Sequence, residues 1–235
     1  MAQRWCHSAP RRQEGLTPDT RSRREFGAYR WIVVGVSTAI NTLAWGVRAT
    51  FALFFVAMLD ECAWGRGPTA LGYSLSWLCF VLVAPVAGWL SDRWGARIVV
   101  TIGGLVLGGA LALTGQVTSL TAYYLCFGLL SAIGIACMLI PSTTIVTRWF
   151  VRSRGTAMGM LSAGTPGGAV AFYPVNAWLI MTLGWRTALV AFGGLVAAIT
   201  VSLALLYRDP PTDADGPAGG AAITRPQRAR TTGET

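Results

Sequence analysis

The sequence has few charged side chains, no lysine and almost no histidine. Asp, Glu, Lys and Arg make up 12% of its 235 residues, against about 25% in soluble domains. All 19 basic residues are arginine, and the single histidine, His7, lies outside the apolar part of the chain. No His-Glu-x-x-His or Cys-x-x-Cys motif occurs. These absences argue against haem ligation, intramembrane serine hydrolysis and zinc proteolysis. We therefore expect no enzyme activity, no cofactor and no metal.

Long apolar runs occupy most of the chain instead. Each run approaches the ~20 residues that cross a hydrocarbon core. The runs are continuous rather than alternating, and Pro85, Pro141, Pro166 and Pro174 fall inside them, as transmembrane helices tolerate. The sequence predicts an all-α membrane protein with six transmembrane helices. The predicted helices cover Trp31–Leu59, Ala70–Leu90, Ile98–Val117, Leu120–Thr147, Gly155–Met181 and Thr187–Tyr207.

The arginines are unevenly distributed around these runs. Most precede the first run, follow the sixth, or lie between runs two and three or four and five, whereas Arg66 and Arg186 lie on the opposite side. Because cytoplasmic loops carry the basic excess, we expect a multi-pass cell-membrane protein with both termini in the cytoplasm. The lipid bilayer is then its partner, and nucleic acid is not. The predicted parts are an Arg-rich tail (1–30), a six-helix domain (31–207) and a disordered tail (208–235).

Arg48 lies deep inside the first run, and no acidic residue lies deep in any run. A guanidinium in mid-bilayer is unfavourable by at least about 2.5–3.5 kcal/mol. Ser37, Asn41 and Arg48 lie within about 40° of one another on a helix, with Trp45 beside them. We interpret this stripe as a wall that binds an anion. The alternative is a stripe that hydrogen-bonds neighbouring helices.

A second polar stripe lies in the fifth run. Thr165 and Asn176 are separated by about 20° in helical projection, and Tyr173 lies near the same face. The small residues of Ser162–Gly168 permit close helix contact, so helix packing is the favoured interpretation here. Tyr173 and Asn176 are nevertheless candidate substrate contacts.

The polar stretch between the second and third runs reads GWLSDRWGAR. We expect a turn of about six residues, with Gly95 in a left-handed conformation, Gly88 at a close helix approach and Asp92 next to a helix N-terminus or an arginine. The stretch resembles the loop signature of the major facilitator superfamily, although Ala96 replaces one of its basic residues. The matching residues are Gly88, Leu90, Ser91, Asp92, Arg93, Gly95 and Arg97.

Four further stretches are similar to the monocarboxylate-porter and oxalate/formate-antiporter branch: Gly46–Phe55, Trp64–Trp77, Thr147–Met160 and Gly184–Gly194. The resemblance implies one half, an inverted repeat of three plus three helices, of a transporter that works by alternating access. It also implies a small organic anion as substrate, in particular a monocarboxylate, because a basic residue near the Arg48 position is associated with the carboxylate in that branch. Gly88, Asp92, Arg93, Gly95 and Arg97 would form a cytoplasmic gating loop.

The superfamily usually has twelve spans, and this sequence predicts six. Three interpretations follow: a fragment of a longer transporter, a half-transporter that pairs with a second six-helix chain or with itself, and an inactive remnant or membrane scaffold. A channel is the competing functional class. Because Arg48 lacks a second wall in a single six-helix unit, we expect the monomer alone to transport nothing.

Overall fold

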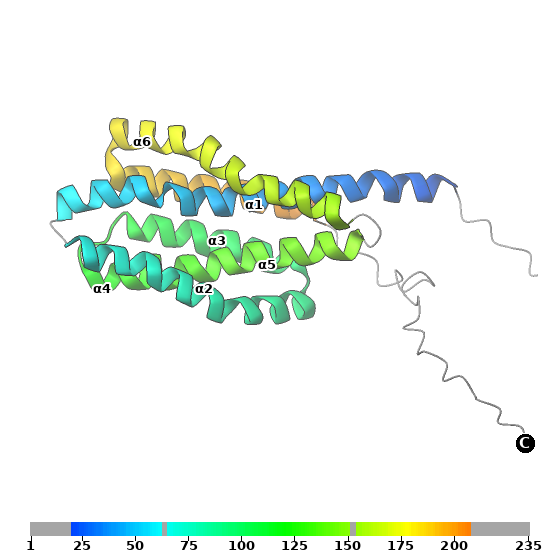
Figure 1. The fold of residues 1–235 in the computed structure, drawn as a ribbon, viewed down its shortest axis with the longest axis horizontal. Helices are drawn as coiled ribbons and strands as arrows, with labels where there is room; N and C mark the ends of the chain where they lie inside the picture. Colours follow the sequence, from blue (N-terminus) through cyan, green and yellow to red (C-terminus); the bar gives the residue numbers. More distant parts are fainter. Residues whose placement is uncertain (1–19, 63–64, 151–153, 208–235) are drawn as a thin grey trace, which may run out of the picture.

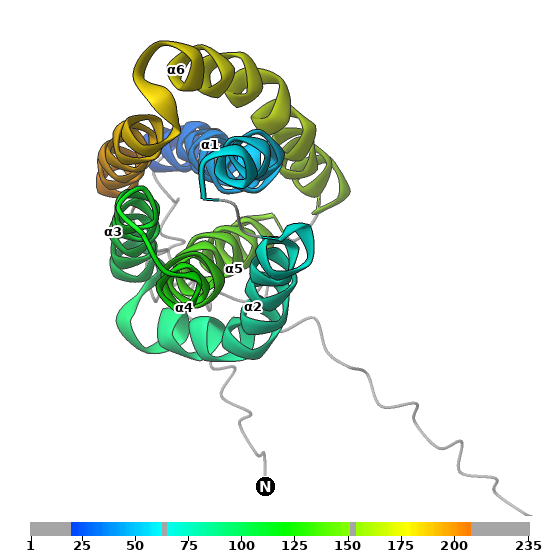
Figure 2. The same cartoon turned by 90° about the vertical axis from the view of Figure 1, so that its left-hand side faces the viewer.

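The computed structural model describes residues 20–62, 65–150 and 154–207 of the chain, and this part is built from helices (Figure 1). The long helices lie side by side along one common direction (Figures 1 and 2). This agrees with the predicted all-α class. The elements are α1 (Thr20–Cys62), α2 (Arg66–Trp94), α3 (Ala96–Thr114), α4 (Leu120–Tyr123), the π-helix η1 (Tyr124–Leu130), α5 (Ser131–Trp149) and α6 (Arg154–Leu205).

The last helix, α6, consists of two membrane-length segments. Its 52 residues would extend about 78 Å as one straight helix, far more than the ~30 Å of a hydrocarbon core. Gly184, with φ 76° and ψ 158°, interrupts it, and the ribbon reverses direction and returns next to α1 (Figures 1 and 2). The elements α4, η1 and α5 form one continuous span from Leu120 to Trp149. Together with α1, α2, α3 and the two segments of α6, this span gives the six predicted membrane segments.

The helix ends differ from the predicted ones. Helix α1 begins at Thr20 rather than Trp31, and a single residue, Gly95, separates α2 from α3 in place of the predicted turn of about six. Hydropathy detects only the apolar middle of a helix, whereas arginine is a good helix former and carries the helix beyond it. Gly95 has the expected positive φ (83°), but its ψ of 148° places it in a region that is essentially restricted to glycine.

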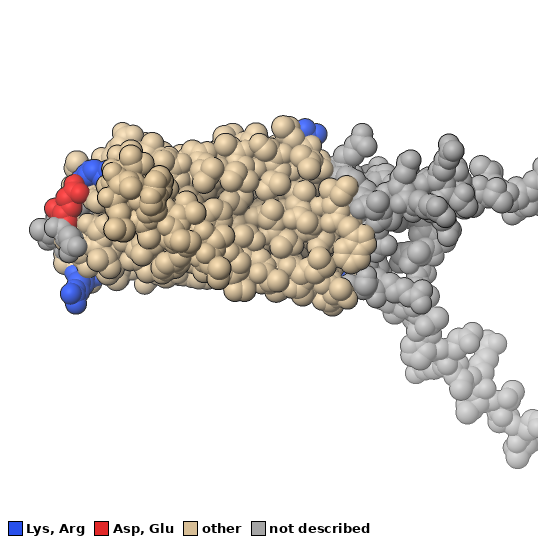
Figure 3. Space-filling model, turned by 90° about the horizontal axis from the view of Figure 1, so that it is seen from above, with Lys and Arg blue, Asp and Glu red and all other residues tan. Residues whose placement is uncertain are grey.

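The surface of the helical body is that of a membrane-spanning protein. In Figure 3 the visible Arg, Asp and Glu side chains lie at the two ends of the body, and a band without charge separates them. Large apolar side chains on α2 face outward, including Leu71, Leu82 and Trp89, which are 61%, 66% and 59% exposed. Water would disfavour such a continuous apolar face, whereas lipid chains solvate it.

Glycines bring helix backbones into direct contact, for example between α6 and α1 and between α3 and α6. A Cβ atom at Gly168 of α6 would lie 2.7 Å from the backbone nitrogen of Gly46 in α1, and one at Gly108 of α3 would lie 2.5 Å from the carbonyl oxygen of Gly193 in α6. Only glycine permits such an approach. The contact at Gly168 confirms the packing expected for Ser162–Gly168. The close approach expected at Gly88 is wrong, because a Cβ there would meet Ile140 at an ordinary 3.7 Å.

Replacement of Gly108 by alanine should destabilise the protein, because the new methyl group would push α3 and α6 apart. We expect a loss of about 1–3 kcal/mol, the usual effect of overpacking. The matched control is Gly109→Ala, since a Cβ at that neighbouring glycine meets open space. Thermal unfolding of both purified variants in detergent tests this expectation; equal melting temperatures would contradict it.

Candidate functional site: a buried arginine beside an open cleft

The Arg48 side chain of α1 is packed on aromatic rings of α2. Arg48 is only 6% exposed. The carbon of its guanidinium lies 3.8 Å from the ring centroid of Trp77 and 5.1 Å from that of Phe80. Both terminal nitrogens are buried and find no hydrogen-bond partner among the described residues. A desolvated cation–π contact contributes about 2 kcal/mol, but it leaves the N–H donors unbonded, which costs at least about 1–3 kcal/mol. The Arg48 guanidinium is therefore a buried cation whose terminal donors are not saturated by regular hydrogen bonds.

The carboxylates whose side chains the structure describes are paired elsewhere. Asp92 accepts a hydrogen bond from Arg148, and Glu61 accepts one from Arg186. Both acids lie at ends of membrane segments rather than at the depth of Arg48. Within the described part of the chain, Arg48 thus has no carboxylate partner, and its neighbours are the rings of Trp77 and Phe80 and the Tyr73 side chain.

An open cleft of about 580 Å³ begins at Arg48 and lies between α1 and α2. This volume is within the range of small-molecule sites, about 300–1,000 Å³. Its walls are mainly apolar, and its polar groups come from Arg48, Tyr73 and Ser74. The lining residues are Arg48, Ala49, Phe51, Ala52, Phe55 and Val56 of α1 and Ala70, Tyr73 and Ser74 of α2.

The predicted stripe on α1 is divided between two neighbouring helices. Ser37 shares a 2.7 Å hydrogen bond with the Tyr207 hydroxyl, and the Asn41 amide nitrogen donates to the Leu161 carbonyl at 2.8 Å. These bonds run to Tyr207, just after α6, and to α6 itself, as the helix-packing alternative expects. Short side chains bond only to the element against which they pack, whereas the long Arg48 side chain extends to α2. Trp45 stays near Arg48, with its ring centroid 6.1 Å from that of Trp77.

The predicted residues of the fifth span lie apart from this cleft. Asn176 is fully buried, and its amide nitrogen donates to the Phe172 carbonyl of the same helix at 2.9 Å. Tyr173 is 38% exposed. Thr165 is 3.4 Å from the Asn41 amide nitrogen, so this stripe contributes to the packing of α6 against α1.

Three aromatic residues at the site escaped the sequence analysis: Tyr73, Trp77 and Phe80. Their spacing of four and three places them on one face of α2. The signal was therefore visible in the sequence. The sequence alone could not assign it to a functional site, because an aromatic stripe at helical spacing is equally typical of core packing.

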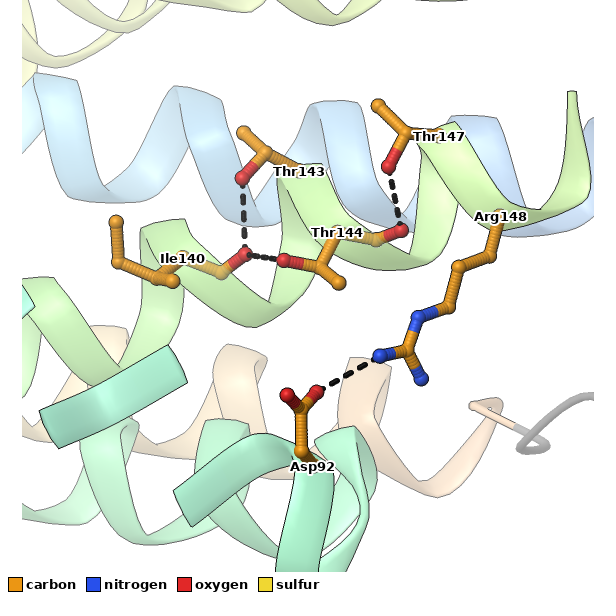
Figure 4. Close-up of polar contacts among 6 residues, drawn as sticks. All are labelled: Asp92, Ile140, Thr143, Thr144, Thr147 and Arg148. Carbon is orange, nitrogen blue, oxygen red and sulfur yellow. Dashed lines mark hydrogen bonds and ion pairs between the residues drawn. The ribbon is translucent and has the colours of Figure 1, made fainter. Parts of the chain in front are cut away.

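The predicted gating loop is connected to α5 by an ion pair (Figure 4). Arg148 donates to the Asp92 carboxylate at 2.7 Å, and both side chains are exposed. Asp92 thus meets an arginine, one of the two expected partners. Such an exposed pair contributes about 0–1 kcal/mol, so it orients the helix ends more than it stabilises them. Arg93 lies 5.5 Å over the Trp89 ring, and Arg97 is exposed in α3.

The hydroxyl groups after Pro141 are bonded within α5, also visible in Figure 4. Thr143 and Thr144 both donate to the Ile140 carbonyl, at 2.8 and 2.9 Å. Proline has no N–H and so leaves a carbonyl on the previous turn without a backbone donor, but these two hydroxyls do not bond to that carbonyl. They bond within their own helix, as expected for such residues in transmembrane helices.

A second polar cluster joins helices at the opposite end of the body. Arg186 donates to the Glu61 carboxylate at 2.9 Å and to the Val117 carbonyl at 3.3 Å, and the Trp185 indole also donates to Glu61. The cluster connects α1, α6 and the segment between α3 and α4. The hydrogen bond from Arg186, followed by that from Trp185, lowers the pKa of Glu61 below its ordinary value.

These features define a multi-pass helical membrane protein with a ligand-sized cleft beside a buried cation. A model of the Major Facilitator Superfamily matches residues 34–231. The chain belongs to the major facilitator superfamily.

Curated relatives carry a more specific name. The chain is 29% identical to monocarboxylate transporter 11 of Homo sapiens over 93% of its own length and 47% of the relative. It is 33% identical to monocarboxylate transporter 13 of Bos taurus, over 75% of the chain and 41% of the relative. Monocarboxylate transporter 7 of Homo sapiens is 28% identical, over 86% and 38%. The chain thus spans less than half the length of these relatives.

Stability should fall at acidic pH through Glu61. A carboxyl group with a folded-state pKa below its unfolded value stabilises the protein above the unfolded pKa, about 4.3, and loses this contribution as the pH falls through the folded pKa. We expect the melting temperature in detergent to decrease below about pH 4.3, and Glu61→Gln to flatten that decrease. Asp92→Asn, which removes a carboxylate at the other end, is the control. An unchanged pH profile in Glu61→Gln would contradict the assignment.

Proposed function

We propose that this six-helix unit binds the carboxylate of a small organic anion, in particular a monocarboxylate, as part of a secondary transporter. The observation that carries the proposal is the buried Arg48 guanidinium, which has no carboxylate partner among the described residues and whose terminal nitrogens make no hydrogen bond of regular geometry there. The fork of a guanidinium matches a carboxylate in charge and geometry. The adjacent cleft provides room for the rest of the ligand. The names of the curated relatives support the same class of substrate.

Transport by alternating access requires a second wall. A midplane site between two six-helix units opens to each side of the membrane in turn. We propose a second six-helix unit as the partner of this one, supported by the greater length of the relatives. In this proposal the cytoplasmic side is gated by the loop residues Gly88, Asp92, Arg93, Gly95 and Arg97. The Asp92–Arg148 ion pair is weak, so its two side chains can exchange partners with little change in free energy.

The proposed binding group is Arg48, with Trp45 beside it. Ser37 and Asn41 enter the proposal as residues that hold α1 in place through their bonds to Tyr207 and Leu161. Tyr173 and Asn176 lie on α6. The contact between α6 and α1 fixes the position of α1 and therefore of Arg48. Of these two residues only Tyr173 is exposed to a substrate, whereas Asn176 is fully buried and bonded within α6.

Replacement of Arg48 by glutamine should abolish carboxylate binding without unfolding the protein. Trp77 lies 3.8 Å from the guanidinium, so acetate added to the purified chain in detergent should change the tryptophan fluorescence in a saturable way. We expect at least about a tenfold loss of affinity in Arg48→Gln, as for the loss of a charged hydrogen bond, and partial retention in Arg48→Lys. Arg66→Gln, at the exposed start of α2, is the matched control. Equal affinity in Arg48→Gln and wild type would refute the proposal.

We also propose that the protein resides in the cell membrane with the α2–α3 turn on the cytoplasmic side, where the arginine excess lies. The α3–α4 connection is then extracellular. Both termini share the side of the α2–α3 turn in this proposal, because the number of spans is even.

The two sides can be distinguished by labelling. Cysteine is introduced at Thr118 or at Arg97, both exposed, after the five native cysteines have been replaced by serine. A membrane-impermeant maleimide should label Thr118→Cys in intact cells and Arg97→Cys only after permeabilisation. The reverse pattern would invert the proposed topology.

A further inference from the structure

The cleft beside Arg48 is lined by aromatic rings on both walls. Phe51 and Phe55 belong to α1, and Tyr73 belongs to α2. We propose that this cleft is an aromatic subsite, which selects carboxylates with a flat apolar ring over short-chain carboxylates. The inference rests on the proposed function, because it assumes that Arg48 binds the carboxylate. It adds the chemical nature of the part of the substrate that lies beyond the carboxylate.

The aromatic wall is held from behind by a stack of four rings. Tyr73 stacks on Phe51 at 4.6 Å between centroids and 15° between planes, and Phe51 stacks on Phe127 at 5.0 Å and 27°. Phe127 in turn stacks on the fully buried Tyr123 at 5.5 Å and 4°. The stack joins α2, α1, η1 and α4, and the Tyr123 hydroxyl donates to the Thr69 carbonyl of α2 at 3.1 Å. A wall that is already ordered loses little entropy when a ring binds to it.

The distribution of polar groups in the cleft matches a ligand with one charged end. Among the described residues that line it, Arg48 is the only charged one, and the others are apolar apart from Tyr73 and Ser74. A second carboxylate would therefore lie against apolar side chains such as Phe55 and Val56, which disfavours dicarboxylates. A two-carbon acid would leave most of the 580 Å³ to water, whereas a phenyl ring would bury apolar surface against the walls.

Three probes test the subsite with the purified full chain in lipid nanodiscs: phenylacetate, acetate and the neutral phenylacetamide. We expect phenylacetate to bind about 10–100-fold more tightly than acetate in equilibrium dialysis, the factor for burial of an aromatic ring. Phenylacetamide should bind at least about tenfold more weakly than phenylacetate, because it lacks the charge that Arg48 recognises.

Variants that fill the cleft test its location without disturbing the core. Ala52 and Ala70 both line the cleft and are exposed, so Ala52→Leu and Ala70→Leu place side chains into the open space. Each should weaken phenylacetate binding by about tenfold and leave acetate binding close to wild type. Ala163→Leu, on the exposed face of α6, is the matched control and should change neither affinity.

The possible results separate this inference from the proposed function. Equal affinities for phenylacetate and acetate, both lost in Arg48→Gln, would overturn the aromatic subsite and leave the anion site intact. Tighter binding of phenylacetate that persists in both Ala52→Leu and Ala70→Leu would place the ring elsewhere and also overturn the subsite. Failure of every probe to bind, or binding that does not depend on Arg48, would overturn the proposed function together with the inference.

Discussion

The contact between the Arg48 guanidinium and the aromatic face of α2 is the interaction on which the proposed site depends. In a low-dielectric layer an isolated cation is strongly disfavoured. The rings of Trp77 and Phe80 attract the guanidinium charge. They do not accept the hydrogen bonds that its N–H groups can donate in the plane of the guanidinium. The charge is thus held in place without being neutralised by a carboxylate among the described residues.

The cleft follows from how α1 packs. Glycine contacts at Gly168 and Gly46 hold α1 against α6, and the bonds of Ser37 and Asn41 lie on that side. The Arg48 side chain extends from the same stripe to α2, where aromatic rings join the two helices and the cleft opens. The polar cluster around Glu61 and the Asp92–Arg148 pair connect the helices at the two ends of the body. Exposed pairs of this kind are weak, which is compatible with helices that move relative to one another.

Comparison of sequence and structure shows where local patterns are informative. The six apolar runs correspond to the six spans, because burial in lipid requires long apolar segments with internally bonded backbones. Helix ends were displaced, as at Thr20 and Gly95, since charged residues end an apolar run but do not end the helix. Gly88 was assigned a close contact on the basis of residue type alone, although a side chain there has ordinary space.

The sequence by itself determined the class of protein, the membrane spans and the presence of a deeply placed arginine without an acid at its depth. Composition and periodicity are local properties, and the membrane acts on them directly. Only the tertiary structure decided what surrounds Arg48: it assigned Ser37 and Asn41 to the packing of α1 and brought Trp77, Phe80 and Tyr73 of α2 to the guanidinium. The reason is physical, since the helical face of a residue is set by its position in the chain, whereas its neighbours are set by which helices pack on that face and how far its side chain extends.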